Sequence, residues 1–124
     1  MSEKKRILVV DDDPDILTLE QRVLTREGFE VVTVDNGKQA IELLSREKFD
    51  LVLLDVMMPE VDGFEVSRAF TESGENRRVP VVFVTARDDA GAMREGFSAG
   101  GTVFLSKPFT AAQLVRLVHT LIGG

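Results

Sequence analysis

Five short apolar runs, rich in β-branched residues, recur along the chain: Arg6–Val10, Glu30–Val34, Leu51–Leu54, Val81–Thr85 and Thr102–Leu105. The first, third and fourth of these runs are almost continuously apolar. Runs of this kind are typical of strands that are buried on both faces of a parallel sheet. The pattern therefore predicts five strands.

The segments between these runs carry apolar residues at helical spacing. The last segment has the clearest pattern, at i, i+3, i+4, i+7 and i+8: Leu114, Leu117, Val118, Leu121 and Ile122. Pro14–Glu27 begins with a proline and is followed by a glycine, as helices often are. Further helical patterns cover Gly37–Lys48, Gly63–Glu72 and Asp89–Ala99.

Alternating strands and helices predict an α/β fold, a doubly wound (βα)₅ sheet of five parallel strands. Right-handed crossovers then place helices on both faces of the sheet. The length of 124 residues suits one domain with its own core. No linker interrupts the pattern, and the polar residues 73–78 are expected to form a surface loop.

Composition and charge exclude several kinds of metal site and binding partner. The chain has no cysteine and one histidine, His119, which we expect to face solvent on the last helix. Any bound metal must then be a hard cation with oxygen ligands. The net charge of −6 disfavours electrostatic binding to the phosphate backbone of nucleic acids. The apolar runs are too short to span a bilayer, and no signal peptide is evident. We expect a cytoplasmic protein that binds neither nucleic acid nor membrane directly.

Reactive side chains follow four of the five strands. Aspartates 11–13 follow the first strand, and Asp55 follows the third. Thr85 ends the fourth strand, and Lys107 comes shortly after the fifth. Ligands of open α/β sheets bind outside the carboxyl ends of the strands. Converging carboxylates need a cation such as Mg²⁺, and a carboxylate is also a competent nucleophile toward phosphorus. The residue types therefore favour phosphoryl transfer, in which Lys107 and Thr85 would stabilise phosphoryl oxygens.

Each of these residues also has a structural interpretation. Asp13 is expected to cap the helix that opens with Pro14. Asp11, Asp12 and the other strand-end residues would be unremarkable if each stood alone. Their joint placement at one edge of the sheet favours a functional site.

Five motifs resemble the receiver domain of bacterial response regulators: Ile7–Asp13, Leu53–Pro59, Asp62–Gly63, Val84–Ala86 and Ser106–Phe109. The resemblance covers residues from about 6 to 122, so that residues 1–124 are expected to be a single receiver domain. It implies the flavodoxin-like fold with strand order 2-1-3-4-5.

The resemblance assigns a role to each strand-end residue. It implies that Asp55 is the phosphoacceptor. A Mg²⁺ ion (or Mn²⁺) would be bound by Asp12 directly, by Asp11 commonly through water, by Asp55, and by the backbone carbonyl of Met57.

The same resemblance implies a switch. Thr85 corresponds to the switch hydroxyl, and Lys107 to the lysine that pairs with a phosphoryl oxygen. The Lys107–Pro108 bond is expected to be cis. Phe104 stands at the position of the switch aromatic, although a half-buried strand aromatic is an equally good interpretation. Met57 and Arg87 occupy positions that tune attack by water, and neither side chain is a good base, so we expect slow self-dephosphorylation.

In function, the resemblance implies a signalling switch rather than an enzyme with a diffusible substrate. A sensor histidine kinase or a histidine phosphotransfer protein would donate the phosphoryl group, and the domain would catalyse its own phosphorylation and dephosphorylation. The surface of the fourth helix, the fifth strand and the last helix would then regulate a downstream protein target or a fused output domain. A phosphorylation-dependent dimer is compatible with this scheme. Gly100-Gly101-Thr102 departs from the family pattern at the entry to the fifth strand.

Two other classes of protein share parts of this pattern. A haloacid-dehalogenase-like phosphatase also uses an aspartate nucleophile, Mg²⁺ and a lysine, but usually has a second aspartate where this chain has Met57. A flavin or nucleotide carrier on the same fold would need a glycine-rich phosphate loop after the first strand. Whether the chain is a stand-alone regulator or part of a longer one stays open.

Overall fold

The computed structural model describes residues 4–71, 74–86 and 103–123. Its elements in chain order are β1 (Arg6–Val10), α1 (Pro14–Arg26), β2 (Glu30–Val34), α2 (Gly37–Arg46), β3 (Leu51–Asp55), α3 (Gly63–Thr71), β4 (Val81–Thr85), β5 (Val103–Ser106) and α5 (Ala111–Ile122). The helix expected over Asp89–Ala99, and Arg87 with it, lie outside the described residues. Within the described part of the chain, no helix is long and apolar enough to cross a membrane.

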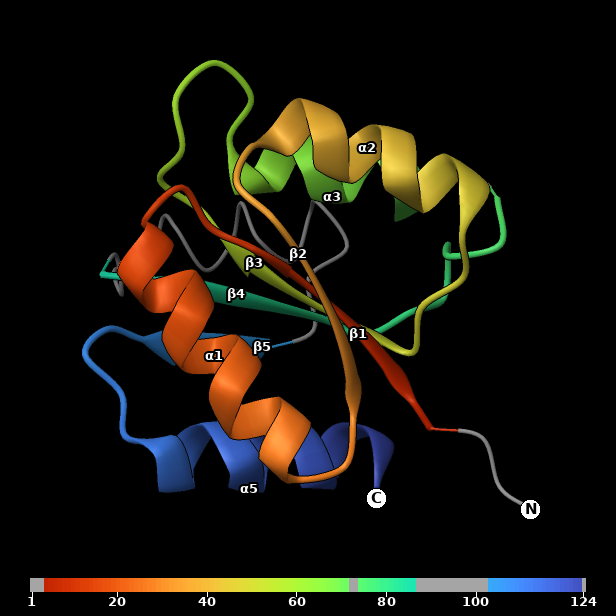
Figure 1. The fold of residues 1–124 in the computed structure, drawn as a ribbon. Coiled ribbons are helices and arrows are strands. Elements are labelled where there is room, and N and C mark those ends of the chain that lie inside the picture. The colour runs from red at the N-terminus through yellow and green to blue at the C-terminus, as the bar shows by residue number, and fades with distance from the viewer. Residues whose placement is uncertain (1–3, 72–73, 87–102, 124) are drawn as a thin grey trace.

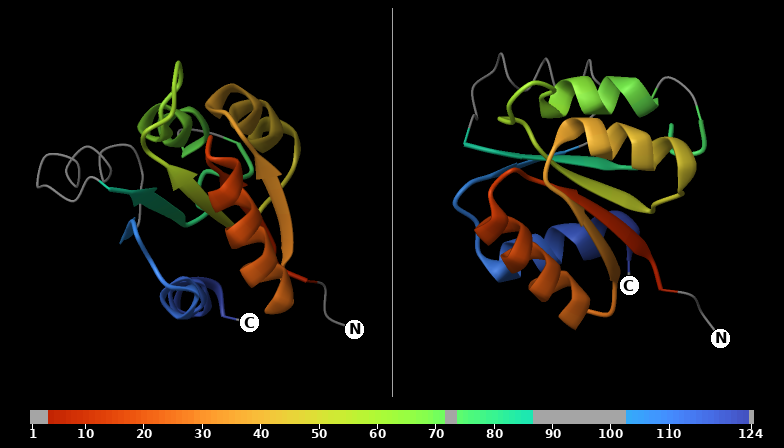
Figure 2. Two further views of the ribbon diagram at one scale, coloured as in Figure 1. Left: turned by 60° about the vertical axis from the view of Figure 1, so that its left-hand side comes forward. Right: turned by 45° about the horizontal axis from the view of Figure 1, so that its top comes forward.

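The five strands form one parallel sheet in the order β2-β1-β3-β4-β5, as expected. Helices α2 and α3 cover one face of this sheet, and α1 and α5 cover the other (Figure 1). The two further views show the same three layers from the side and from above (Figure 2). The expected α/β, doubly wound architecture is thus confirmed for the described elements.

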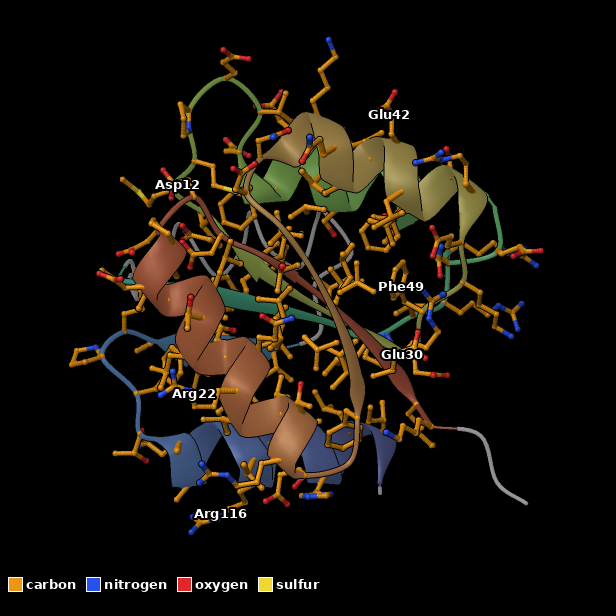
Figure 3. All side chains as sticks on the ribbon, in the orientation of Figure 1. Asp12, Arg22, Glu30, Glu42, Phe49 and Arg116 are labelled. Carbon is orange, nitrogen blue, oxygen red and sulfur yellow. The ribbon has the colours of Figure 1, made fainter. Side chains whose placement is uncertain are left out.

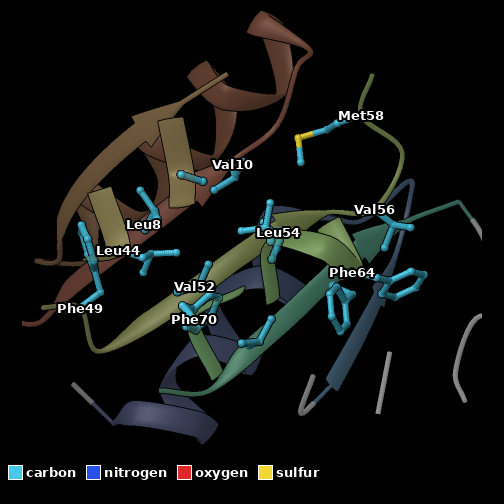
Figure 4. Packing of buried hydrophobic residues seen from close by; sticks show 14 residues of the cluster. Leu8, Val10, Leu44, Phe49, Val52, Leu54, Val56, Met58, Phe64 and Phe70 are labelled. Atoms are coloured by element: carbon cyan, nitrogen blue, oxygen red, sulfur yellow. The ribbon is translucent and has the colours of Figure 1, made fainter. Parts of the chain in front are cut away.

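Each face of the sheet has its own hydrophobic core. Successive side chains of a strand point to opposite faces, so Ile7 and Val9 pack toward α1 and α5, while Leu8 and Val10 pack toward α2 and α3. Figure 4 shows the core on the side of α2 and α3, which contains Leu8 and Val10 and in which Phe64 of α3 lies on the sheet. Burial on both faces explains why the central strands are almost continuously apolar.

The strand boundaries follow the sequence pattern closely. Strand β3 continues one residue further than expected, through Asp55, because this residue still pairs with Val84 of β4. Within the described residues β5 begins at Val103 and continues to Ser106, which pairs with Thr85. The last residues of β3, β4 and β5 therefore lie side by side at the carboxyl edge of the sheet.

Two helix ends differ from the expectation. Helix α1 ends at Arg26, with Glu27 as its C-cap. Helix α2 ends at Arg46 rather than at Lys48, because Glu47 is in the extended conformation.

The loop expected at the surface before β4 contains a buried residue, Asn76, which is 1% exposed. Its amide donates to the carbonyls of Leu44 and Glu47 at 2.8 Å each and accepts from the Phe49 N–H at 2.9 Å. One side chain thus provides hydrogen-bond partners for backbone groups at the end of α2 and just before β3.

His119 is half-buried rather than facing solvent freely. Its Nε2 lies 3.1 Å from a carboxylate oxygen of Glu27, and its Nδ1 lies 3.2 Å from the carbonyl of Gly123. The hydrogen bond with Glu27 raises the pKa of His119 above its ordinary value. The residue therefore joins the ends of α1 and α5.

The amino edge of the sheet is held by polar contacts of its own. The guanidinium of Arg6 bonds to Glu30 and Glu47 at 2.7 Å each and lies 4.5 Å from the centre of the Phe49 ring. The ammonium of Lys5 donates to the carbonyl of Ile122 at 2.6 Å, which brings the two ends of the chain together at this edge.

Candidate functional site

The site begins with Asp11, directly after β1. Its side chain is 1% exposed, and its N–H donates to the carbonyl of Val34 at 3.3 Å. One carboxylate oxygen accepts from the Asp13 N–H at 2.9 Å, and the other accepts from the ammonium of Lys107 at 3.1 Å. The buried carboxylate is therefore fixed from both the β1–α1 loop and the loop after β5.

Asp12 and Asp13 have different surroundings. Asp13 caps α1 by accepting from the Asp15 N–H at 2.9 Å, and Pro14 occupies the first turn, so its structural interpretation is confirmed. Asp12 is exposed, and Figure 3 shows it on the loop that follows β1. The cap fixes the direction of this loop and so keeps Asp12 at the carboxyl edge of the sheet.

Asp55 is the last residue of β3 and is 4% exposed. One of its carboxylate oxygens accepts from the Met57 N–H at 3.3 Å and lies 3.5 Å from the ammonium of Lys107. Met57 itself is 61% exposed, in the loop between β3 and α3. The carboxylate thus lies just beneath the surface, with backbone on one side and a cation on the other.

Three carboxylates converge at this edge. One oxygen each from Asp11, Asp12 and Asp55 lies within 4.8 Å of the others. Among the described residues, Lys107 is the cation that pairs with this cluster, through Asp11 and Asp55. Three carboxylates so close together repel one another, and a divalent cation would offset that repulsion. Carboxylate oxygens are the ligands that hard cations prefer. The arrangement therefore indicates a metal site and fits Mg²⁺ or Mn²⁺.

The charged groups of this cluster shift one another's pKa values. Burial, together with the neighbouring charge of Asp11, raises the pKa of Asp55 to about 7, although Lys107 and the Met57 N–H act in the opposite direction. For Lys107, burial acts to lower the pKa, but the hydrogen bond with Asp11 and the charge of Asp55 outweigh it, so that its pKa lies above the ordinary value. The ammonium therefore stays charged at neutral pH.

The remaining predicted residues lie at the ends of β4 and β5. Thr85 is 1% exposed, and its carbonyl accepts from the Lys107 N–H at 3.0 Å. The Lys107–Pro108 bond is cis, as expected. Phe104 is half-buried, with its ring centre 5.4 Å from that of Phe83 and 6.5 Å from that of Phe64. The structure thus brings Thr85 and Lys107 to the carboxylate edge and places Phe104 against the core.

One charged residue near the site was not predicted. Glu20 of α1 is 1% exposed, and burial, together with the charge of Asp11, raises its pKa to about 8. The sequence does contain a signal for this position. The apolar stripe of α1 has residues at i, i+3, i+7 and i+8, namely Ile16, Leu19, Val23 and Leu24, and Glu20 occupies the i+4 position where another apolar residue is expected.

Known proteins resemble the chain along nearly its whole length. The family model described as the response regulator receiver domain matches residues 7–119. The transcriptional regulatory protein YrkP of Bacillus subtilis, itself uncharacterized, is 42% identical over 109 residues, which are 88% of this chain and 46% of YrkP. The response regulator PleD of Caulobacter vibrioides is 40% identical over 116 residues, which are 94% of this chain and 26% of PleD. The chain thus spans half or less of the length of these relatives.

Solved structures agree with these sequence matches. The chemotaxis protein CheY4 of Vibrio cholerae superimposes with a TM-score of 0.92 at 28% identity, over 96% of this chain and 99% of that one. The receiver domain of the sensor histidine kinase PA1611 from Pseudomonas aeruginosa has a TM-score of 0.89 at 32% identity, over 98% and 100% of the two chains. That structure has a magnesium ion coordinated in its active-site cleft. The fold, the strand-end carboxylates and the matched family model together show that this chain belongs to the response regulator receiver domain family.

Proposed function

We propose that this chain is the phosphoacceptor switch of a two-component phosphorelay and that Asp55 takes the phosphoryl group. The observation that carries the proposal is the convergence of Asp11, Asp12 and Asp55 within 4.8 Å, beside the ammonium of Lys107. Few reactions other than phosphoryl transfer call for a nucleophilic carboxylate, a metal site and a fixed ammonium at one place.

The proposed cofactor is Mg²⁺, or Mn²⁺ in its place. Asp11, Asp12 and Asp55, together with the backbone carbonyl of Met57, would hold the ion. When bound, the ion offsets negative charge on the oxygens of the transferring phosphoryl group. The magnesium ion in the PA1611 receiver domain supports this choice.

The proposed donor is a phosphohistidine of a sensor histidine kinase or a histidine phosphotransfer protein. A carboxylate oxygen of Asp55 attacks phosphorus in line with the leaving nitrogen. The new P–O bond forms as the P–N bond breaks, and the released imidazole nitrogen takes up a proton. Lys107 stabilises the phosphoryl oxygens because its charge already lies beside Asp55.

Phosphorylation would then change the surface of the domain. The phosphoryl group adds a charge of about −1.5 to −2, which attracts the hydroxyl of Thr85 and the ammonium of Lys107. Phe104, which packs on Phe83, would change its position with these residues and so alter the surface formed by the fourth helix, β5 and α5. A downstream protein target, or an output domain fused to the receiver, would read this surface, and a phosphorylation-dependent dimer is compatible with it.

We also propose the extent of the domain, its compartment and the lifetime of its phosphoryl group. Residues 1–124 act as one receiver domain, with a core of about residues 6–122, in the cytoplasm. Because Met57 and Arg87 are poor bases for orienting water, we expect the aspartyl phosphate to be hydrolysed slowly. A lifetime of only seconds in the purified protein would contradict this expectation.

The experiment that tests the proposed function is mass spectrometry after incubation with Mg²⁺ and acetyl phosphate. The expected result is the mass of one added phosphoryl group on the wild type, no addition on Asp55→Asn, and normal addition on the exposed control Asp35→Asn. Addition to Asp55→Asn would mean that another residue is the acceptor. Steady turnover of a small phosphate ester would instead indicate a phosphatase of the haloacid-dehalogenase class.

A further inference from the structure

Glu20 is a buried acid without the contacts that usually stabilise one. It is 1% exposed, and its Oε2 has no hydrogen-bond partner among the described residues. It stands on the apolar face of α1, between Ile16 and Leu24, where a leucine would avoid the cost of burying an unpaired polar group. A use of this carboxyl in the neighbouring site would explain its presence.

Among the described residues, the charged groups that act on Glu20 belong to that site. Asp11 and Asp55 disfavour its ionised form, whereas the ammonium of Lys107 favours it. Helix α1 also contacts the loop that carries Lys107, since Ile16 and Leu19 line a groove together with Lys107. Glu20 therefore lies buried on the helix that borders the Lys107 loop, within range of the charge of the ammonium.

Lys107 occupies oxygens that the proposed cation also needs. Its ammonium bonds to Asp11 at 3.1 Å and lies 3.5 Å from Asp55. An ammonium and a divalent cation on the same carboxylates repel each other, and the burial of Asp11 and Asp55 strengthens this repulsion. Binding of the cation would therefore favour movement of the ammonium away from Asp11 toward another acceptor.

We propose that Glu20 is that acceptor: a positioning residue that takes over the ammonium of Lys107 when a divalent cation occupies the aspartate cluster. This inference rests on the proposed metal site. The Glu20 carboxyl ionises as the ion pair forms, because an adjacent cation favours its charged form, and its proton passes to solvent. Lys107 is thereby held near Asp55 without competing for the metal ligands.

The test is a double-mutant cycle on the binding of Mg²⁺, measured by isothermal titration calorimetry, since the chain has no tryptophan or tyrosine to report by fluorescence. The dissociation constant is measured for the wild type, Glu20→Gln, Lys107→Met and the double variant. We expect Glu20→Gln to weaken Mg²⁺ binding roughly three- to tenfold when Lys107 is present, which is the size of an ordinary coupling between neighbouring charges. In the Lys107→Met background the same substitution should have no effect.

The controls separate this inference from the proposed function. Glu42→Gln removes an exposed charge from α2 and should leave the affinity unchanged, and Glu20→Asp should restore part of it. Equal effects of Glu20→Gln with and without Lys107, or no effect in either background, would overturn the role of Glu20 while leaving the metal site intact. Failure of the wild type to bind Mg²⁺ at all would contradict the metal site itself.

Discussion

At the scale of single residues, Asp55 combines two opposing requirements. In the proposed reaction its carboxylate must be ionised to attack phosphorus, yet burial beside Asp11 raises its pKa to about 7. Near neutral pH the free chain is therefore a mixture of protonated and ionised Asp55. A bound divalent cation would favour the ionised form, so that the nucleophile is available chiefly when the metal is present.

The raised pKa of Asp55 predicts how stability depends on pH. The folded value of about 7 lies above the ordinary 3.8, so the carboxyl ionises first in the unfolded chain as the pH rises. Between about pH 4 and pH 7 the metal-free wild type should lose stability relative to Asp55→Asn, by on the order of 2–4 kcal/mol, and above that range the difference should level off. Urea unfolding in the presence of a chelator measures the difference. Asp35→Asn is the control, and its free energy of unfolding should follow that of the wild type at every pH. The prediction fails if Asp55→Asn behaves in the same way.

Most residues of the candidate site could be predicted because they stand at strand ends. Asp11, Asp55 and Thr85 follow or close apolar runs, and parallel pairing brings such ends to one edge. Asn76 could not be predicted in the same way, because a polar loop is expected at the surface. Glu20 lies within the apolar stripe of α1, but a charged side chain is ordinarily expected to reach solvent. Their burial depends on contacts made by distant segments, such as the bond from Phe49 to Asn76, 27 residues later.

At the scale of elements, the position of Asp55 depends on how closely α3 approaches β3. Gly63, the first residue of α3, donates its N–H to the carbonyl of Val56 at 3.1 Å. A methyl group at this position would meet the backbone carbonyl of Asp55 and the Cα of Val56. Only a residue without a side chain allows the helix to start so near the end of β3, where Asp55 lies.

We therefore expect Gly63→Ala to affect both stability and the site. The added methyl should destabilise the fold by about 1–3 kcal/mol, as overpacking usually does, and should slow phosphorylation by acetyl phosphate because the backbone of Asp55 is displaced. Thermal unfolding and the rate of mass addition measure the two effects. Gly37→Ala is the matched variant: it would crowd Val61 instead, so it should lower stability with a smaller effect on the rate. Unchanged unfolding of Gly63→Ala would contradict the close approach.

Asn76 connects the end of α2 to the start of β3. Asn76→Ala leaves two carbonyls and one N–H without their partner and should destabilise the protein by about 2–4 kcal/mol. Asn76→Asp keeps an acceptor for Phe49 but loses both donors, so it should destabilise as well. Chemical denaturation checks both variants against Glu75→Gln, an exposed neighbour that should be nearly neutral. Wild-type stability of Asn76→Asp would show that the two donated bonds contribute little.

The elements themselves were predictable where periodicity is strong, and their ends were less so. The runs Arg6–Val10, Glu30–Val34 and Val81–Thr85 are the observed strands β1, β2 and β4. The end of α2 was placed two residues too late, because Glu47 and Lys48 are good helix formers. Glu47 instead has an extended backbone, and its carbonyl accepts a hydrogen bond from the distant Asn76, a tertiary contact that helical periodicity does not encode.

At the scale of the whole molecule, negative charge is concentrated where the cation is proposed to bind. The chain carries a net charge of −6, and three of its carboxylates share one edge of the sheet. Folding brings these groups together, so their repulsion opposes the folded state until a cation is present.

Removal of the metal should therefore lower thermal stability. With Mg²⁺ at about one hundred times its dissociation constant, the linkage relation gives about 2.7 kcal/mol of added stability, or a rise in Tm on the order of 10 °C. A chelator should reverse the rise, and Asp12→Asn should reduce it strongly. NaCl at matched ionic strength is the control. An equal rise with NaCl would show that screening of the net charge, rather than a specific site, produces the effect.

The Lys5–Ile122 bond has a practical consequence. Both ends of the described chain lie at the amino edge of the sheet, across the molecule from the aspartates (Figure 1). A purification tag or a fluorescent reporter joined to either end would start on the side remote from the nucleophile and leave its approach clear.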